Sequence, residues 1–424
     1  MGKDVVQLIG GTRLEGDVIL SGAKNAALPC IVAACLGEIP SILENVPLKL
    51  NDVQQLIELL RKSGANIQID EQNNRLYCSR GEFQGGEADK ELACKVRPSL
   101  LLLGLTAALG HEISLAQPGG CQIGDRKYDL HLMGLRKLGA FVEERENEIY
   151  VDARSGLAGS SMDFYLPTTT GSENIMIAAT TARGKTLIRN ANTRPEVIQM
   201  GQLLNLMGCK VTMQSRIVEI EGVTKIKGDA HFTIMSGWDE AVTYIIAAGM
   251  TGGEIVVHDF NLSHIREDAR HLREIGLELF EWKEKVFVSG KKDKNPFDLF
   301  TAPYPGINSD MQPLFAGLAT TIHGVSTITD LRFTERFKYV EELKQFGADI
   351  EAFGNSAIVR GGGNLTAANV AATDLRGGMA CVLVGLVSQG TTTVSNVYQI
   401  ERGYEDFIGK LNSLGAKLAR ASIE

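Results

Sequence analysis

Two polar residues open a run of small residues near the start of the chain. Lys24 and Asn25 precede Ala-Ala-Leu-Pro, a composition typical of the first turn of a buried helix. A lysine in this place can meet a phosphate or a carboxylate, helped by the partial positive charge of a helix N-terminus. Taken alone, the position fits an ordinary solvated lysine equally well.

A second candidate is Cys121, which is flanked by Gly119, Gly120 and Gly124. Glycines of this density predict a loop, whereas structural cysteines are usually buried. Arg126 and Lys127 follow closely and would lower the pKa of the thiol, which favours attack by the thiolate or donation of a proton by the thiol. The other six cysteines are scattered without a CxxC pair, so most are predicted to be small buried residues.

Arginines and one aspartate form the third set. Arg97, Arg336, Arg376 and Arg402 carry the planar fork that matches a carboxylate or a phosphate, although most isolated arginines are surface residues. Asp310 follows a Pro-Gly turn and precedes a predicted helix. It can be the N-cap of that helix, or the base that accepts a proton from a substrate hydroxyl.

These residues are set in a six-fold internal repeat. An amphipathic helix, a glycine turn and a strand recur at intervals of about 70 residues along the whole chain. The glycines that end the six helices are Gly64, Gly139, Gly208, Gly276, Gly347 and Gly415. Each suits the left-handed conformation that terminates a helix. The repeat predicts an α/β or α+β fold of two similar domains with three repeats each.

The composition excludes some classes of protein. With 43 basic and 51 acidic residues the net charge is −8, which argues against a nucleic-acid partner. The longest apolar stretch, residues 99–110, is too short to cross a bilayer, and the N-terminus lacks an apolar signal segment. We therefore expect a cytoplasmic protein with no membrane partner. His131 is predicted to be a packing or helix N-terminal residue without a chemical role.

Six motifs together resemble one family, the UDP-N-acetylglucosamine 1-carboxyvinyltransferases. The motifs are SGAKNAALP, KVRPS, PGGCQIGDRKYDLH, YPGINSDMQ, TDLRGG and QIERGYE, and the resemblance runs from about Leu8 to Ala419. It implies a two-domain inside-out α/β barrel of six βαβαββ-type units, three per domain. One domain would comprise residues 1–21 and 228–424, the other residues 22–227, with the active site in the cleft between them.

The same resemblance implies the reaction and its residues. The enolpyruvyl group of phosphoenolpyruvate would pass to the 3-hydroxyl of UDP-N-acetylglucosamine, with release of phosphate and without a metal or another cofactor. Catalysis would involve Cys121, Asp310 and Lys24. Phosphoenolpyruvate would be held by Lys24, Asn25, Arg126, Arg376 and Arg402. The sugar nucleotide would contact Arg97, Arg126, Lys127, Tyr128, Asp129, Leu130, Thr168, Thr169, Asp310 and Arg332.

Departures from the family pattern gather on the acceptor side. Residues 168–172 read Thr-Thr-Thr-Gly-Ser in place of Ser-Val-Gly-Ala-Thr, and Lys127 replaces a proline. Residues 237–240 read Gly-Trp-Asp-Glu in place of Asp-Arg-Ile-Glu, and Arg332 replaces an aliphatic residue. Two alternatives therefore stay open: a related enzyme that acts on another nucleotide such as UMP in specialised metabolism, and a catalytically silent binding protein.

Overall fold

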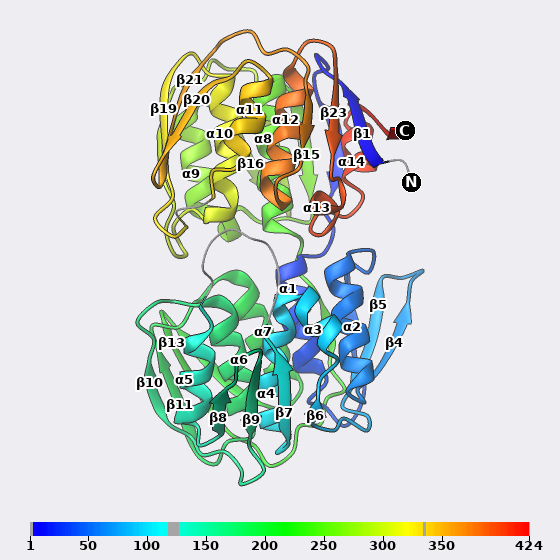
Figure 1. Cartoon of the computed structure of the whole chain (residues 1–424), viewed down its shortest axis with the longest axis vertical. Coiled ribbons are helices and arrows are strands. Elements are labelled where there is room, and N and C mark those ends of the chain that lie inside the picture. Colours follow the sequence, from blue (N-terminus) through cyan, green and yellow to red (C-terminus); the bar gives the residue numbers. More distant parts are fainter. Residues whose placement is uncertain (1–2, 118–126, 334–335, 424) are drawn as a thin grey trace. The chain divides into compact units, whose positions relative to one another are not determined.

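A computed structural model describes residues 3–117, 127–333 and 336–423, which divide into two compact units (Figure 1). Unit 1 comprises residues 3–21 and 236–423, and unit 2 comprises residues 22–117 and 127–235. The sequence placed the return of the chain to the first domain at residue 228. The structure keeps residues 228–235 in unit 2, because the strand His231–Thr233 pairs in parallel with Ser41–Glu44.

Unit 2 begins with a helix and contains a 3-10 helix, η1, before its fourth helix. Its elements are α1 (Lys24–Ala34), β3 (Ser41–Glu44), α2 (Asn51–Lys62), β4 (Asn66–Asp70), β5 (Arg75–Ser79), β6 (Gly86–Glu87), α3 (Lys90–Lys95), η1 (Arg97–Leu100), α4 (Leu101–Ala108), β7 (Glu112–Ala116), α5 (Asp129–Lys137), β8 (Phe141–Glu144), β9 (Glu148–Asp152), β10 (Ser161–Asp163), α6 (Thr169–Ala179), β11 (Lys185–Arg189), α7 (Pro195–Leu206), β12 (Lys210–Gln214), β13 (Ile217–Glu221) and β14 (His231–Thr233).

Unit 1 holds both ends of the described chain. Its elements are β1 (Lys3–Ile9), β2 (Glu15–Ile19), α8 (Trp238–Thr251), β15 (Glu254–His258), η2 (Leu262–Ile265), α9 (Arg266–Ile275), β16 (Glu278–Trp282), β17 (Lys285–Ser289), β18 (Asp298–Phe300), η3 (Ser309–Met311), α10 (Gln312–Thr320), β19 (Gly324–Thr329), α11 (Tyr339–Gln345), β20 (Asp349–Phe353), β21 (Ser356–Gly361), β22 (Asn369–Ala371), α12 (Leu375–Val387), β23 (Thr391–Ser395), α13 (Tyr398–Glu401), α14 (Phe407–Ser413) and β24 (Lys417–Ile423).

Within the described residues the strands form six four-stranded sheets of one common pattern. The orders are β14-β3-β5-β4, β6-β7-β9-β8 and β10-β11-β13-β12 in unit 2, and β2-β15-β17-β16, β18-β19-β21-β20 and β22-β23-β1-β24 in unit 1. Each sheet has one parallel edge strand followed by antiparallel pairs. The six-fold repeat is therefore present in the sheets as well as in the helices.

Three helices form the centre of each unit: α1, α4 and α6 in unit 2, and α8, α10 and α12 in unit 1. Nearly every residue of these helices is buried, and in each unit all three contact one another. Beyond their first turns these helices consist mainly of small and apolar residues, as a buried helix requires. The helices lie inside and the sheets outside in each unit (Figure 1), which confirms the predicted inside-out α/β architecture.

The six repeat glycines adopt the predicted left-handed conformation. Their φ angles lie between +83° and +122° in the turns from the outer helices to the following strands. A side chain on an L-residue clashes in this region, so glycine lets the chain reverse tightly at each of these points.

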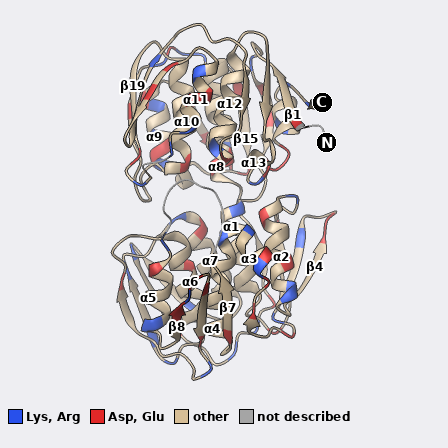
Figure 2. Cartoon of the chain, in the orientation of Figure 1, with Lys and Arg blue, Asp and Glu red and all other residues tan. Residues whose placement is uncertain are grey.

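The charged side chains are not concentrated on one helix or one strand. Lys and Arg are interspersed with Asp and Glu on the helices and strands of both units (Figure 2). Among the described residues, no helix has the length and apolar composition needed to cross a bilayer.

Replacement of Gly208 by alanine tests the glycine turns. At Gly208 φ is +98°, and an added Cβ would meet no atom within 4 Å, so the cost of alanine is backbone strain alone. We expect Gly208→Ala to lower the free energy of unfolding by about 1 kcal/mol or more, measured by urea titration. Gly363→Ala is the matched control, because it also meets no atom within 4 Å but lacks a positive φ. Equal unfolding midpoints for the two variants would contradict the prediction.

Candidate active site

Asp310 lies in η3 with an arginine on each side. Nη1 of Arg336 is 2.7 Å from Oδ1 of Asp310, and Nη2 of Arg376 is 3.7 Å from Oδ2. The arginine side chains are 4% and 1% exposed, whereas that of Asp310 is 28% exposed. The carboxylate is therefore held by buried cations and still reaches the surface of its unit, where it can accept a proton from a bound hydroxyl.

The alternative role of Asp310 as a helix cap is wrong. Asn308 caps η3, since its Oδ1 accepts a hydrogen bond from the backbone N–H of Asp310 at 3.1 Å. The following helix, α10, has no side-chain cap and carries a proline in its first turn. The Asp310 carboxylate is thus engaged with the two arginines and not with a helix N-terminus.

Arg376 stands in the first turn of α12 with its side chain buried. Asp374 caps this helix by accepting hydrogen bonds from the N–H groups of Arg376 and Gly377, at 2.8 and 3.0 Å. The guanidinium lies over the ring of Tyr404, 5.0 Å from its centroid. Within the described residues, its Nε and Nη1 have no hydrogen-bond partner. Because a buried unpaired donor costs about 1–3 kcal/mol, these N–H groups suit an anionic ligand.

Asp239 is a partner of Arg376 that the sequence analysis missed. It lies in the first turn of α8, is 7% exposed, and accepts a hydrogen bond from Nη2 of Arg376 through Oδ2. The two residues are 137 positions apart. The only signal in the sequence was that an aspartate stands where the family has an aliphatic residue.

Asp330 extends the charged group beyond Arg336. Ser309 links the two: its Oγ accepts from Nη1 of Arg336 at 3.2 Å and donates to Oδ2 of Asp330. Oδ1 of Asp330 accepts from the backbone N–H groups of Arg332 and Phe333, at 2.9 and 3.0 Å. We call Asp239, Asp310, Asp330, Arg336 and Arg376 the acid–arginine cluster, and all five lie in unit 1.

In unit 2, the predicted site residue Lys24 has a well-defined partner. It is the first residue of α1, and its Nζ donates to Oδ2 of Asp52 at 3.0 Å. The two side chains are 13% and 8% exposed, so the pair is mostly shielded from water. Lys24 is therefore not the solvated side chain that the sequence also allowed. Asp52 lies at the start of α2 and was not predicted.

Several predicted acceptor residues lie around the N-terminus of α5: Arg97, Lys127, Tyr128, Asp129 and Leu130. Nη2 of Arg97 donates to the backbone oxygen of Lys127 at 3.2 Å, which joins the start of η1 to the segment before α5. Oδ2 of Asp129 accepts from the hydroxyl of Tyr165 at 2.8 Å. Leu130 is 5% exposed and belongs to the core, so its side chain offers no surface to a ligand.

The Thr168–Ser172 segment, which departs from the family, begins α6. Oγ1 of Thr168 caps the helix by accepting from the N–H of Gly171 at 3.3 Å. Oγ1 of Thr169 accepts from Nδ2 of Asn192 at 3.0 Å. Arg332, the other marked departure, is exposed in unit 1, and its guanidinium lies 5.2 Å from the ring centroid of Phe333. In its unit the guanidinium is therefore not buried.

For the remaining predicted site residues, the structure gives the element and the burial where it describes them. Cys121 and Arg126 lie outside the described residues. Asn25 is half-buried beside Lys24 in α1, and Arg402 is half-buried as the C-cap residue of α13. Asp310, Arg336 and Arg376 are thus the candidate residues that the structure brings into one cluster within a unit.

His131 has the packing role that the sequence predicted. It is 2% exposed, with Nδ1 3.0 Å from Nδ2 of Asn174 and Nε2 3.3 Å from Oγ1 of Thr170. Burial, with a smaller contribution from Arg97, lowers the pKa of His131 to about 3. The imidazole is therefore neutral at physiological pH.

The described cysteines are buried with one exception. Cys30, Cys35, Cys78, Cys209 and Cys381 are buried as predicted, and Cys94 is exposed. Burial raises the pKa of Cys78 and of Cys209 to about 12, so these thiols are poor nucleophiles at neutral pH. Among the described residues, no group of three or more His, Cys, Asp or Glu side chains could hold a metal ion.

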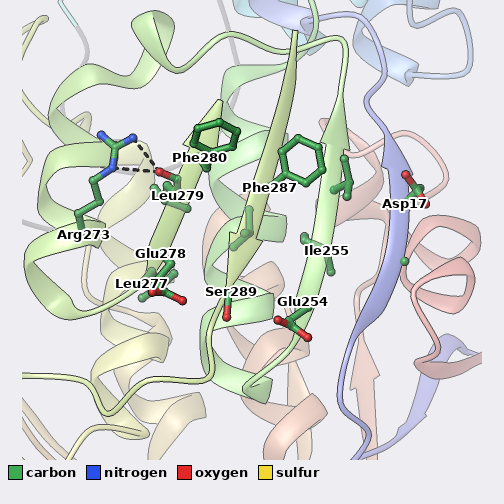
Figure 3. A pocket seen from close by; sticks show the side chains of 13 residues that line it. Asp17, Glu254, Ile255, Arg273, Leu277, Glu278, Leu279, Phe280, Phe287 and Ser289 are labelled. Carbon is green, nitrogen blue, oxygen red and sulfur yellow. Dashed lines mark hydrogen bonds between the residues drawn. The ribbon is translucent and has the colours of Figure 1, made fainter. Parts of the chain in front are cut away.

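A surface cavity of about 530 Å³ lies elsewhere in unit 1, on the sheet formed by β2, β15, β17 and β16 (Figure 3). Phe280 and Phe287 belong to its apolar lining, and Arg273 donates from Nε and Nη2 to the backbone oxygen of Leu279. None of the predicted site residues lines this cavity. Its lining supplies no arrangement of acid, base and free cations, so it is not the candidate active site.

Comparisons with known proteins agree over nearly the whole chain. Residues 8–411 match the family model described as EPSP synthase (3-phosphoshikimate 1-carboxyvinyltransferase). A UDP-N-acetylglucosamine 1-carboxyvinyltransferase 1 of Caldanaerobacter subterraneus is 40% identical over 410 residues, covering 96% of this chain and 97% of the relative. A protein of the same name from Symbiobacterium thermophilum is 38% identical over 415 residues, covering 97% and 94%.

Two solved structures share the fold at low identity. The enolpyruvyl transferase NikO from Streptomyces tendae superposes with a TM-score of 0.90 at 21% identity and covers 100% of both chains. An EPSP synthase from Acinetobacter baumannii gives 0.78 at 16% identity, with 99% of this chain and 100% of the other covered. Together with the matches to the family model and to the relatives, these findings show that the chain belongs to the EPSP synthase family of enolpyruvyl (1-carboxyvinyl) transferases.

Proposed function

We propose that this chain transfers the enolpyruvyl group of phosphoenolpyruvate to the 3-hydroxyl of UDP-N-acetylglucosamine and releases phosphate. This reaction is the first committed step of peptidoglycan precursor synthesis. The observation that carries the proposal is the full-length similarity, at 38–40% identity, to relatives named UDP-N-acetylglucosamine 1-carboxyvinyltransferases. We place the reaction in the cytoplasm, as expected from the sequence.

Asp310 is the proposed general base. It accepts the proton of the acceptor hydroxyl while the hydroxyl oxygen attacks C2 of phosphoenolpyruvate. Its ion pairs with Arg336 and Arg376 support this role, because they orient the carboxylate while leaving it 28% exposed. A base must be positioned before it is useful, and two buried guanidinium groups provide that positioning.

Cys121 is the proposed proton donor to C3, or the nucleophile that adds to C2. Protonation at C3 and attack at C2 give a tetrahedral phospho-ketal. Loss of phosphate from C2 and of a proton from C3 then restores the double bond as an enolpyruvyl ether. The C2–O bond to the acceptor replaces the C2–O bond to phosphate, and C3 gains one proton and then loses one, so no oxidation state changes and no redox partner is needed.

Lys24, Asn25, Arg126, Arg376 and Arg402 are the proposed ligands of phosphoenolpyruvate. The substrate carries about three negative charges at neutral pH, one on the carboxylate and nearly two on the phosphate. Several fixed cations are therefore needed to bind it and to stabilise the leaving phosphate. The buried Nε and Nη1 of Arg376, which have no partner among the described residues, support this assignment.

The proposed acceptor contacts are Arg97, Arg126, Lys127, Tyr128, Asp129, Thr168, Thr169, Asp310 and Arg332. Leu130, which the resemblance also implied, is left out because its side chain is buried in the core. An arginine at position 332 would disfavour the sugar if it were desolvated without a partner. Its exposure in unit 1 removes that objection. The alternative acceptor, a nucleotide such as UMP, is favoured only by the sequence departures, since similarity to NikO at 21% identity shows the fold alone.

Loss of the carboxylate charge at position 310 tests the base. We expect Asp310→Asn to lower kcat by about 10²- to 10⁴-fold, because an amide cannot accept the hydroxyl proton. Binding of phosphoenolpyruvate, followed by calorimetry, should change little. Asp349→Asn is the control, since Asp349 forms an exposed pair with Arg360 at 3.1 Å in the same unit. A kcat for Asp310→Asn close to that of the control would contradict the assignment.

Alkylation tests Cys121. An epoxide phosphonate that mimics phosphoenolpyruvate should modify Cys121, faster when UDP-N-acetylglucosamine is present, and Cys121→Asp should resist it. Peptide mass spectrometry locates the adduct. Cys94 is the exposed competitor, so Cys94→Ser should be modified as fast as the wild type. An adduct that disappears in Cys94→Ser would exclude Cys121 as the activated thiol.

Phosphate release with different acceptors tests the whole proposal. We expect UDP-N-acetylglucosamine to give a higher kcat/KM than UMP or UDP. Arg332→Val should alter only the KM for the acceptor and leave the use of phosphoenolpyruvate unchanged, because Arg332 is a proposed acceptor contact. If UMP is the better acceptor and Arg332→Val abolishes that preference, the alternative enzyme is correct. No phosphate release with any acceptor would favour a silent relative.

A further inference from the structure

Charges alternate along the acid–arginine cluster. Asp239 contacts Arg376, Arg376 lies near Asp310, and Asp310 contacts Arg336. The guanidinium of Arg376 is therefore shared by two carboxylates, while that of Arg336 contacts Asp310 and Ser309. How Arg376 divides between its two carboxylates therefore contributes to how strongly Asp310 is neutralised.

Asp239 has the closer contact with Arg376. Nη2 of Arg376 donates to Oδ2 of Asp239 but lies 3.7 Å from Oδ2 of Asp310, beyond hydrogen-bond distance. The other oxygen of Asp239 accepts from the backbone N–H of Glu240 at 3.0 Å, so both carboxylate oxygens are fixed to α8 and α12. Stacking on Tyr404 further limits the movement of the guanidinium.

The consequence concerns Asp310. A carboxylate in full contact with two guanidinium groups holds its negative charge too strongly to be an effective base, since each cation disfavours protonation. Here Arg336 makes a full ion pair at 2.7 Å and Arg376 does not. The charge of Asp239 also partly offsets that of Arg376.

We propose that Asp239 is a positioning residue, which holds the Arg376 guanidinium back from Asp310 so that Asp310 remains able to accept the proton of the acceptor hydroxyl. This inference rests on the proposed function for its kinetic consequence.

The other charged and titratable groups of the cluster are the same in the wild type and in a variant that changes only Asp239. Arg336 faces Asp310 from the segment before α11, Asp330 acts through Ser309 from the end of β19, and Tyr404 lies against Arg376. Glu240 also faces Asp239: it is buried, pairs with Lys410 at 2.5 Å, and burial, with a smaller contribution from Asp239, raises its pKa to about 7. Loss of the Asp239 charge therefore also lowers the pKa of Glu240, and the titration of Asp310 itself is what reports the division of Arg376 between its two carboxylates.

Asp239→Asn is the decisive variant, because the amide keeps the shape and one acceptor oxygen but loses the charge. Arg376 should then shift toward Asp310. We expect the acid limb of the kcat–pH profile to move to lower pH by about one unit, and kcat on the plateau to fall about tenfold as the base weakens. Asp239→Glu should restore most of the plateau, since it restores the charge.

A direct titration separates this inference from the proposed function. The ¹³C carboxyl resonance of Asp310, assigned by its loss in Asp310→Asn, should titrate at lower pH in Asp239→Asn than in the wild type. This readout needs no acceptor, so it remains valid if the wild type fails to act on UDP-N-acetylglucosamine. Gly208→Ala is the control for lost stability, since residue 208 lies in unit 2.

The outcomes are distinct. The positioning role is supported if the titration midpoint of Asp310 is lower in Asp239→Asn than in the wild type. The midpoint should be unchanged in Gly208→Ala and should return toward the wild-type value in Asp239→Glu. An unchanged midpoint of Asp310 in Asp239→Asn overturns it, whatever happens to kcat. The inference is also overturned if kcat falls in Asp239→Asn while the acid limb stays unshifted, and Gly208→Ala shows the same loss of kcat. Lost stability alone would then account for the effect.

Discussion

Mutual burial of three helices is the contact on which each unit depends. In α4 every residue is buried, and in α8, α10 and α12 almost every residue is buried. Helices can approach so closely only where side chains are small, as at Gly104, where an added Cβ would lie 2.3 Å from Oδ1 of Asn174. The outer helices and the sheets then cover this centre, and each sheet turns one apolar face inward.

Within each unit the same packing places candidate residues at the starts of the central helices. Lys24, Asp239 and Arg376 lie in the first turns of α1, α8 and α12, and Asp310 directly precedes α10. Thr168 caps α6 in a corresponding position. The start of a helix has unpaired N–H groups and a partial positive charge, so repeating it gives a fold several places that favour anions. A six-fold repeat thus supplies similar positions that different side chains can occupy.

Burial also explains why charge in this site is paired. The side chain of Arg376 is 1% exposed and that of Arg336 is 4% exposed. A guanidinium keeps its proton at any physiological pH, so each must have carboxylates nearby or bear the cost of an isolated buried charge. Asp239 and Asp310 meet that need for Arg376. Pairing with carboxylates therefore allows cations that can bind an anionic substrate to be present in a buried site before the substrate binds.

The sequence by itself determined the repeat, the six helix-ending glycines and the types of residue able to meet a phosphate or a carboxylate, because these depend on local periodicity and on side-chain chemistry. Only the tertiary structure decided the partners: Asp52 for Lys24 and Asp239 for Arg376, which lie 28 and 137 positions away. It also decided that Asp310 pairs with arginines and does not cap a helix. Such pairs form when packing brings distant helix ends together, and no local pattern records that contact.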